Sequence, residues 1–139
     1  MLKNTTEIPV RFSEVDSLRV VWHGHYLKYF EDGREGFGKQ YGFSYLDIFN
    51  AEGLAVPIVD AQLQFKKPLE YGDSAIIETT FINSPAAKII FGFKIFSKNH
   101  KYLVCEGKTT QVFMNPATQE LYITNPLFFE TWKRKHKLL

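Results

Sequence analysis

The stretch HYLKYFEDGREGFGKQYG, residues 25–42, decides the fold of this chain. Its apolar and aromatic positions recur at spacings of three and four residues, the period of one face of an α-helix. The predicted helix begins at about His25 and ends at Tyr41 and Gly42, because glycine readily closes a helix. At ~1.5 Å per residue this helix is roughly 25 Å long.

The predicted helix contains an unusual run of glycines at Gly33, Gly36 and Gly38. Each costs on the order of 1 kcal/mol relative to alanine inside a helix, so the run needs a reason. One interpretation is that another backbone, such as a sheet wrapped around the helix, approaches closely at these positions. The alternative is a helix that frays after Gly36, and the pattern alone leaves both open.

Strands dominate the rest of the chain. Alternating apolar and polar residues predict strands at 7–12, 54–65, 75–82, 88–96 and 103–114. A short helix is expected before Gly53, and a terminal helix from Pro126. One early helix followed by long antiparallel strands predicts a single α+β domain over residues 1–139. A sheet edge left open favours a homodimer that extends the sheet.

The composition indicates a globular protein with an aromatic core. Thirteen Phe and seven Tyr among 139 residues can bury a sizeable apolar area. The single cysteine, Cys105, excludes an internal disulfide framework and the multi-cysteine zinc patterns. It lies in an apolar strand and is expected to be a buried, inert thiol in a reducing compartment.

Charge and hydropathy indicate the partners and the compartment. The formal net charge is only +2, and the basic tail at 133–137 lacks the interleaved aromatic residues of a nucleic-acid-binding segment. No window approaches the roughly 18 to 20 apolar residues of a membrane span, and no signal-peptide pattern opens the chain. We therefore expect a cytoplasmic protein with no nucleic-acid partner and no membrane span.

Candidate chemistry is concentrated in RFSEVDSLRVVWHGHY, residues 11–26. Asp16 follows a strand, and a partly buried carboxylate there can act as nucleophile or general base. The alternative is that Asp16 only caps a turn. At the helix start, the unpaired N–H groups of His23 and Gly24 can stabilise an oxyanion. The imidazole of His23 can orient a water or the carbonyl, or be a structural histidine.

Other chemistries have weak signatures in this chain. His23 and His25 together with Asp16 form a poor metal-binding pattern, so no metal and no cofactor is expected. The sequence also lacks GxSxG, a P-loop and GxGxxG. Their absence removes the usual serine hydrolase, nucleotide-binding and dinucleotide-binding interpretations.

Two separated motifs, DSLRVVWHGHYLKYFEDGRE at 16–35 and FKKPLEYGD at 65–73, occur in a recognisable order. Together they resemble the hotdog-fold acyl-CoA thioesterases of the 4-hydroxybenzoyl-CoA thioesterase type, including the Tol-Pal-associated branch. The first is similar to that family's acid, Val-Val-Tyr/Trp-His and helix start with Phe-Glu and Arg. The second is similar to its strand and turn ending in Gly-Asp. The resemblance spans nearly the whole chain.

The resemblance implies a long central helix wrapped by a bent antiparallel sheet, which gives the helix glycines a reason. It also implies dimers, often paired into tetramers, with an acyl-CoA or acyl carrier protein thioester at the subunit interface. Asp16 matches the family's catalytic acid. His23 matches a histidine of the Tol-Pal-associated branch, and its N–H occupies the position that polarises the carbonyl.

The substrate is expected to contact the helix start and an apolar segment later in the chain. The residues of this expected substrate site are Trp22, Gly24, His25, Tyr26, Pro57, Ile58 and Val59.

Three residues depart from the family pattern. Arg19 replaces a usual glycine, His25 replaces Asn or Ser, and Phe12 stands where one branch has tyrosine. Two competing functions stay open, the first because the same fold also serves it and the second because of these departures. One is a dehydratase or hydratase of 3-hydroxyacyl thioesters, which pairs a histidine with an acid. The other is a non-catalytic acyl-thioester-binding protein in which Arg19 and His25 have altered the site.

Overall fold

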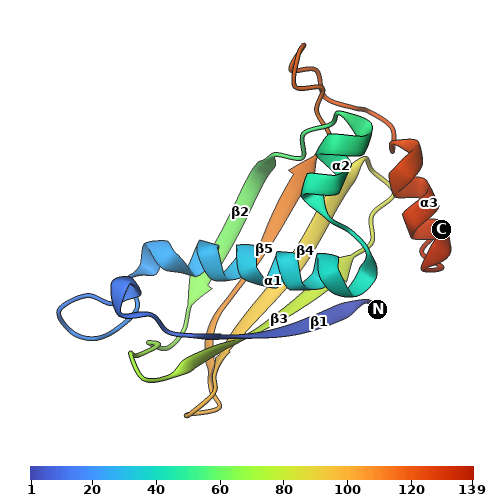
Figure 1. The fold of residues 1–139 in the computed structure, drawn as a ribbon. Helices are drawn as coiled ribbons and strands as arrows, with labels where there is room; N and C mark the ends of the chain where they lie inside the picture. The colour runs from blue at the N-terminus through green and yellow to red at the C-terminus, as the bar shows by residue number, and fades with distance from the viewer.

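A long helix, α1 (Tyr26–Tyr41), lies across one face of a five-stranded sheet in the computed structural model, which describes residues 1–139 (Figure 1). The strands are β1 (Lys3–Pro9), β2 (Ile58–Phe65), β3 (Ser74–Ile82), β4 (Lys88–Ser97) and β5 (Leu103–Val112). Their order is β1-β3-β4-β5-β2, and every neighbouring pair is antiparallel. The predicted α+β hotdog architecture is confirmed, with β1 and β2 at the two edges.

The helix boundaries follow the sequence signals. α1 ends at Gly42, which has φ 72° and donates its N–H to the carbonyl of Gly38. The short helix α2 (Tyr45–Glu52) is closed by Gly53, and α3 (Leu127–Lys135) follows Pro126. All three predicted helices are therefore confirmed. None of them is both long and apolar enough to cross a membrane.

The glycines of α1 lie where the sheet touches the helix. A Cβ atom at Gly33 would lie 2.6 Å from Cγ2 of Ile77 on β3 and would overlap Oγ1 of Thr79. A Cβ atom at Gly36 would overlap Oγ1 of Thr6 on β1. Helix α1 also continues regularly to Tyr41. Close approach of the sheet, rather than fraying, therefore explains the glycine run.

Aromatic side chains fill the space between α1 and the sheet. Phe30 stacks on Phe93 with 4.4 Å between ring centroids, and Phe37 meets Phe91 edge-on at 4.9 Å. At the far end of α1, Trp132 of α3 donates its indole N–H to the carbonyl of Tyr41 over 2.9 Å. The end of the molecule distant from the β1–α1 loop is thereby closed by α3 (Figure 1).

The first strand lies earlier in the chain than predicted. β1 spans Lys3–Pro9 instead of 7–12, and Phe12–Glu14 form a short 3₁₀ turn. The prediction failed because the inward-facing positions of β1 include Asn4 and Thr6, whose polarity hides the alternation. The start of the second predicted strand also shifts: β2 begins at Ile58 rather than at residue 54.

Asp73 ties the turn before β3 to the turn between β4 and β5. Its carboxylate is buried and accepts hydrogen bonds from Ser97 Oγ at 2.5 Å, Ser74 N at 2.7 Å and Asn99 N at 3.0 Å. Burial alone would raise the pKa of Asp73, but these hydrogen bonds outweigh it and hold the pKa below its ordinary value. The ionised form is therefore the one that stabilises the fold.

We predict that Gly33→Ala lowers the free energy of unfolding by about 1–3 kcal/mol, because the added methyl group has no space against β3. Helix propensity alone would change stability by about 1 kcal/mol in the opposite direction. Urea unfolding measures the difference. Lys39→Ala, on the exposed face of α1, is the control and should stay within about 0.5 kcal/mol of wild type. A Gly33→Ala protein as stable as wild type would contradict the close contact.

A second prediction concerns the stability of the fold at low pH. A depressed folded-state pKa means that Asp73 contributes stability above its unfolded pKa of about 3.9, and that this contribution is lost as pH falls through the folded value. Asp73→Asn should therefore lower the melting temperature at pH 7 and flatten its fall between pH 5 and pH 3. Calorimetry across this range is the measurement. Equal acid dependence in the two proteins would refute the role of Asp73.

Candidate active site

The loop between β1 and α1 presents Asp16 on a tight turn. Asp16 N donates to Val20 O at 3.1 Å, and Arg19 N donates back to Asp16 O at 2.9 Å. The N–H of Leu18 donates to Oδ1 of the Asp16 side chain at 2.8 Å. Oδ2 receives no hydrogen bond from the chain. Turn capping and chemistry are therefore compatible, because one oxygen holds the turn while the other stays available.

Asp16 is exposed in the single chain, whereas the sequence interpretation expected partial burial. Its position is nevertheless fixed by the segment before β3. Val21 N donates to Leu69 O at 2.7 Å, and Tyr71 N donates to Arg19 O at 3.0 Å. The two sequence motifs at 16–35 and 65–73 thus meet in space, and the second braces the turn that carries Asp16.

The start of the helix offers two free hydrogen-bond donors. His23–His25 form a 3₁₀ turn that leads into α1, and His25 N donates to Trp22 O at 2.9 Å. The N–H groups of His23 and Gly24 donate to no acceptor in the chain. Because the helix dipole adds positive potential here, these two groups suit an oxygen that gains negative charge.

Trp22 shapes this helix start. Its indole lies directly over Gly24, so that a Cβ atom there would come within 2.5 Å of two ring carbons and closer still to a third. The ring also packs on His23 at 4.6 Å and on His25 at 5.7 Å between centroids. A side chain at position 24 would therefore displace the indole, and the expected site residues from 22 to 25 pack together.

A pocket of about 360 Å³ joins the turn to the helix start. Four of the expected site residues line it: Asp16, Trp22, His23 and Tyr26. The other lining residues are Val20, Val21, Phe65, Lys66, Lys67 and Pro68. Gly24 lies beneath the indole, and His25 lies behind it, so neither lines the pocket.

The hydroxyl of Tyr26 stays protonated in this pocket. Burial raises the pKa of Tyr26 to about 12, with only partial relief from a hydrogen bond with the backbone of Leu69. The ring of Tyr26 meets Phe65 at 5.4 Å between centroids. At neutral pH this wall of the pocket is therefore uncharged and largely apolar.

Pro57, Ile58 and Val59 do not line this pocket within one chain. They lie at the beginning of β2, whereas the pocket residue Phe65 ends the strand. At about 3.3 Å per residue, the strand separates the two ends by roughly 20 Å. Within one chain the extended strand therefore carries these three residues away from the pocket, and their contact with the substrate stays a prediction.

Glu14 is a site residue that sequence reasoning missed. It is buried, and Oε1 accepts hydrogen bonds from the hydroxyl of Tyr29 at 2.8 Å and from Arg11 N at 2.8 Å. Its backbone carbonyl accepts from Trp22 N at 3.0 Å. Burial, together with the hydrogen bond to Glu14, raises the pKa of Tyr29 far above its ordinary value. Glu14 therefore holds the loop against α1. The three-residue spacing from Arg11 to Glu14 is the only sequence signal for it.

Other reactive groups lie outside this site. Cys105 is buried, and burial raises the pKa of its thiol to about 11, so it is neutral at physiological pH. No group of three or more His, Cys, Asp and Glu side chains is arranged to hold a metal ion.

Comparison with known proteins gives the same family for most of the chain. Residues 10–131 match the model of the thioesterase-like superfamily. YneP of Bacillus subtilis (strain 168), provisionally named an acyl-CoA thioesterase, is 36% identical over 91 residues. This alignment covers 66% of the present chain and 65% of YneP, just under two thirds of that relative's length.

Solved structures share the fold. A DHNA-CoA thioesterase from Staphylococcus aureus superposes with a TM-score of 0.88 and 25% identity, covering 99% of this chain and 91% of that one. The 4-hydroxybenzoyl CoA thioesterase of Pseudomonas sp. strain CBS-3 superposes with a TM-score of 0.81 at 17% identity, covering 94% of this chain and 98% of that one, which shows likeness of fold alone. Membership of the Tol-Pal-associated branch stays a prediction.

The buried hydrogen bond from Tyr29 to Glu14 is expected to stabilise the folded chain. Glu14→Ala leaves the hydroxyl of Tyr29 buried without its acceptor and should cost about 1–3 kcal/mol of unfolding free energy. Tyr29→Phe added to Glu14→Ala removes the orphaned hydroxyl and should recover part of that loss. A double-mutant cycle by urea unfolding measures the coupling. Strictly additive effects would show that the two side chains do not interact.

Proposed function

Because the chain belongs to the thioesterase-like superfamily, we propose that it hydrolyses an acyl thioester of CoA or of acyl carrier protein to a free acid and a thiol. The observation that carries the proposal is that a free carboxylate oxygen on Asp16 and residue His23 border one pocket, and that the N–H groups of His23 and of the adjacent Gly24 donate to no acceptor in the chain. A nucleophile or base and an oxyanion site are the two elements that thioester cleavage requires.

In the proposed reaction the thioester carbonyl oxygen accepts hydrogen bonds from the N–H groups of His23 and Gly24. These bonds strengthen as the oxygen gains negative charge, which lowers the barrier to attack on the carbonyl carbon. The helix dipole of α1 adds to the same effect.

Two routes are open to Asp16. As a nucleophile, Oδ2 attacks the carbonyl carbon and expels the thiolate, leaving a mixed anhydride that water then hydrolyses to free acid and Asp16 carboxylate. As a general base, the carboxylate takes a proton from water while the water oxygen attacks, and the thiolate again leaves. Both routes require the carboxylate and consume one water per thioester.

The imidazole of His23 is assigned an orienting role. It packs between Trp22 and Phe65, with 6.2 Å to the Phe65 centroid, and borders the pocket. No carboxylate in the chain is hydrogen-bonded to it, whereas a dehydratase or hydratase would use a histidine and an acid together. Incubation with an enoyl thioester separates that alternative, because hydrolysis releases a free thiol, whereas hydration adds water across the double bond and leaves the thioester intact.

We place the subunit contact at β2, an edge strand with most of its side chains exposed. Val59 and Phe65 are 56% and 54% exposed, which is unusual for large apolar residues and suits a covered surface. Antiparallel pairing of two β2 strands would extend the sheet and bring the beginning of one strand beside the end of the other. Pro57, Ile58 and Val59 of one subunit would then approach the pocket of its partner.

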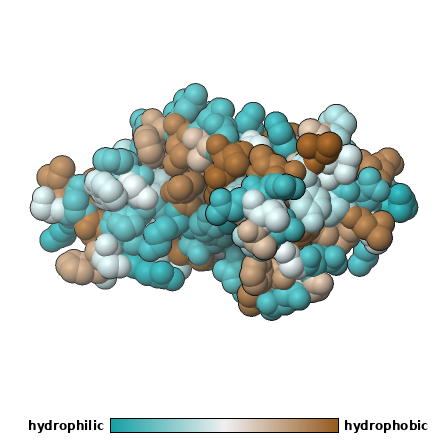
Figure 2. Space-filling model, turned by 90° about the horizontal axis from the view of Figure 1, so that it is seen from above, coloured by the Kyte–Doolittle hydropathy of each residue, from teal (hydrophilic) through white to brown (hydrophobic).

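A pairing of two dimers into a tetramer would use the sheet face away from α1. Ile76, Phe96 and Leu103 form a cross-strand apolar row on this face and are only partly buried. From above, by contrast, apolar and polar side chains alternate in small patches (Figure 2).

We assign the protein to the cytoplasm, where a single reduced cysteine is stable.

The central prediction is that Asp16→Asn lowers kcat for acyl-CoA hydrolysis by about a thousandfold or more while the protein stays folded, because Asn keeps the acceptor for Leu18 N but cannot attack or take a proton. Thiol release from a panel of acyl-CoA substrates is the assay. Glu70→Gln, which removes a nearby exposed carboxylate, should leave the rate unchanged. Full activity in Asp16→Asn would remove Asp16 from the mechanism.

A further prediction concerns the edge of the sheet. The carbonyl of Gln62 faces Gly107 on β5, so the neighbouring Ala61 directs its N–H outward. Ala61→Pro removes that donor and should convert a dimer of the 16.2 kDa chain to a monomer in sedimentation velocity. Ala86→Pro, in the exposed segment between β3 and β4, tests whether any added proline has this effect. A wild-type chain that sediments as a monomer would contradict the proposed contact.

A further inference from the structure

Arg19 adopts a backbone conformation that disfavours its own side chain. Its φ is +63°, in the left-handed region where a residue with a Cβ atom costs roughly 1–2 kcal/mol relative to glycine. Hydrogen bonds on both sides hold it there, from Arg19 N to Asp16 O and from Tyr71 N to Arg19 O. Strain maintained by surrounding contacts at the edge of an active site points to a use for the side chain.

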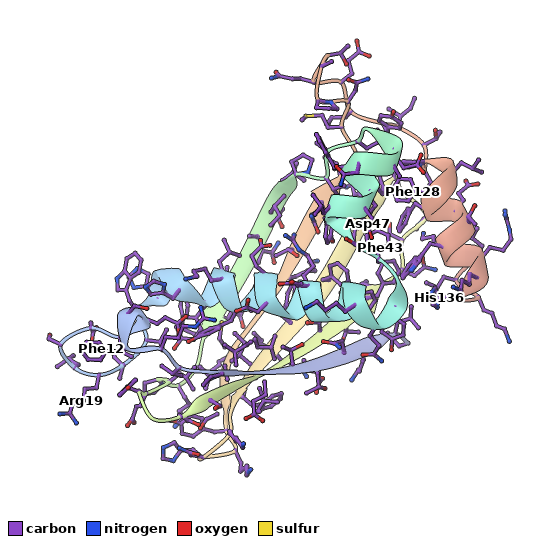
Figure 3. All side chains as sticks on the ribbon, viewed as in Figure 1. Phe12, Arg19, Phe43, Asp47, Phe128 and His136 are labelled. Atoms are coloured by element: carbon purple, nitrogen blue, oxygen red, sulfur yellow. The ribbon has the colours of Figure 1, made fainter.

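The charge of Arg19 is not neutralised within the chain. None of the four ion pairs involves it, although Asp16 lies only three residues away. Arg19 is exposed and extends outward from the tip of the β1–α1 loop, on the same side of the molecule as Phe12 (Figure 3). A guanidinium that is always charged and has no partner is suited to bind an anion.

Arg19 also borders a second pocket, distinct from the one described above. This pocket has a volume of about 420 Å³ and shares Asp16 with the first. Phe12 and Tyr71 form part of its lining, with their rings edge-on at 5.7 Å between centroids. The same pocket thus sets apolar side chains beside both the carboxylate of Asp16 and the cation of Arg19, which suits a carrier arm with methylene and methyl groups between its thioester and its phosphate.

Resting on the proposed thioesterase function, we propose that this second pocket binds the pantetheine arm of the substrate and that Arg19 binds a phosphate of that arm. The apolar part of pantetheine lies over Phe12 and Tyr71, and the phosphate, which must remain hydrated, meets the exposed guanidinium. The acyl group then occupies the first pocket, beside Trp22 and Tyr26. Arg19 is thus a specificity residue for phosphorylated thiol carriers.

The test compares one acyl group on three thiols: CoA, phosphopantetheine and pantetheine without phosphate. Arg19→Gly should raise KM for the phosphorylated substrates about tenfold, with kcat little changed, and leave the pantetheine thioester unaffected. Arg19→Lys should retain part of the preference. Because glycine relieves the backbone strain, the melting temperature of Arg19→Gly should equal or exceed that of wild type, so unfolding cannot explain the loss.

Lys101→Gly is the matched control. Lys101 is also an exposed cation at positive φ, 66°, but it lies in the turn between β4 and β5 and outside both pockets. Its removal should leave all three KM values unchanged. If Arg19→Gly raises KM equally for the CoA and phosphopantetheine thioesters, the contact is with the phosphate that both carriers share. If KM rises for the CoA thioester alone, the contact is with the nucleotide phosphates.

Two results would overturn the inference while leaving the hydrolase intact. One is an Arg19→Gly enzyme with wild-type KM for every substrate. The other is an Arg19→Gly enzyme whose KM rises as much for the pantetheine thioester as for the phosphorylated substrates. A wild-type protein that cleaves no thioester would instead refute the proposed function. In that case calorimetric titration with CoA still tests Arg19, because weaker CoA binding by Arg19→Gly needs no turnover.

Discussion

The close contact between α1 and the sheet is the constraint on which the rest of this structure depends. Without side chains at Gly33 and Gly36, the helix backbone lies against β3 and β1. Phe30 and Phe37 then reach strand β4 in register. The position and direction of α1 are thereby fixed, and with them the turn at its start that carries the free N–H groups of His23 and Gly24.

The site is assembled from segments far apart in sequence, each fixed by different contacts. Hydrogen bonds hold the loop from residue 10 to residue 25 in place. Glu14 in the loop accepts one from Tyr29 of α1, and further bonds join the loop to Leu69 and Tyr71 in the segment before β3. Asp16 itself needs no buried environment in the single chain, because its turn is made by its own side chain and by Arg19. The free carboxylate and the helix start therefore keep their mutual position through local hydrogen bonds.

The sequence predicted α1, its end at Gly42 and the strand-rich second half, because these depend on periodicity and glycine chemistry that are legible in one chain. It could not place β1, whose inward residues Asn4 and Thr6 break the apolar alternation. Of the expected site, Asp16, Trp22, His23 and Tyr26 meet at one pocket. Residues 57–59 do not, because pocket membership depends on strand length and on pairing between chains, which spacing does not encode.

The substrate orientation follows from the same geometry. With its carbonyl at the start of α1 and its carrier arm toward Arg19, an acyl thioester crosses Asp16 from one pocket to the other. A crystal structure with a non-hydrolysable acyl-CoA analogue tests this account most directly. The account predicts the analogue's carbonyl oxygen about 2.7–3.1 Å from the N–H groups of His23 and Gly24, with Asp16 facing the carbonyl carbon. A carbonyl bound away from the helix start would contradict it.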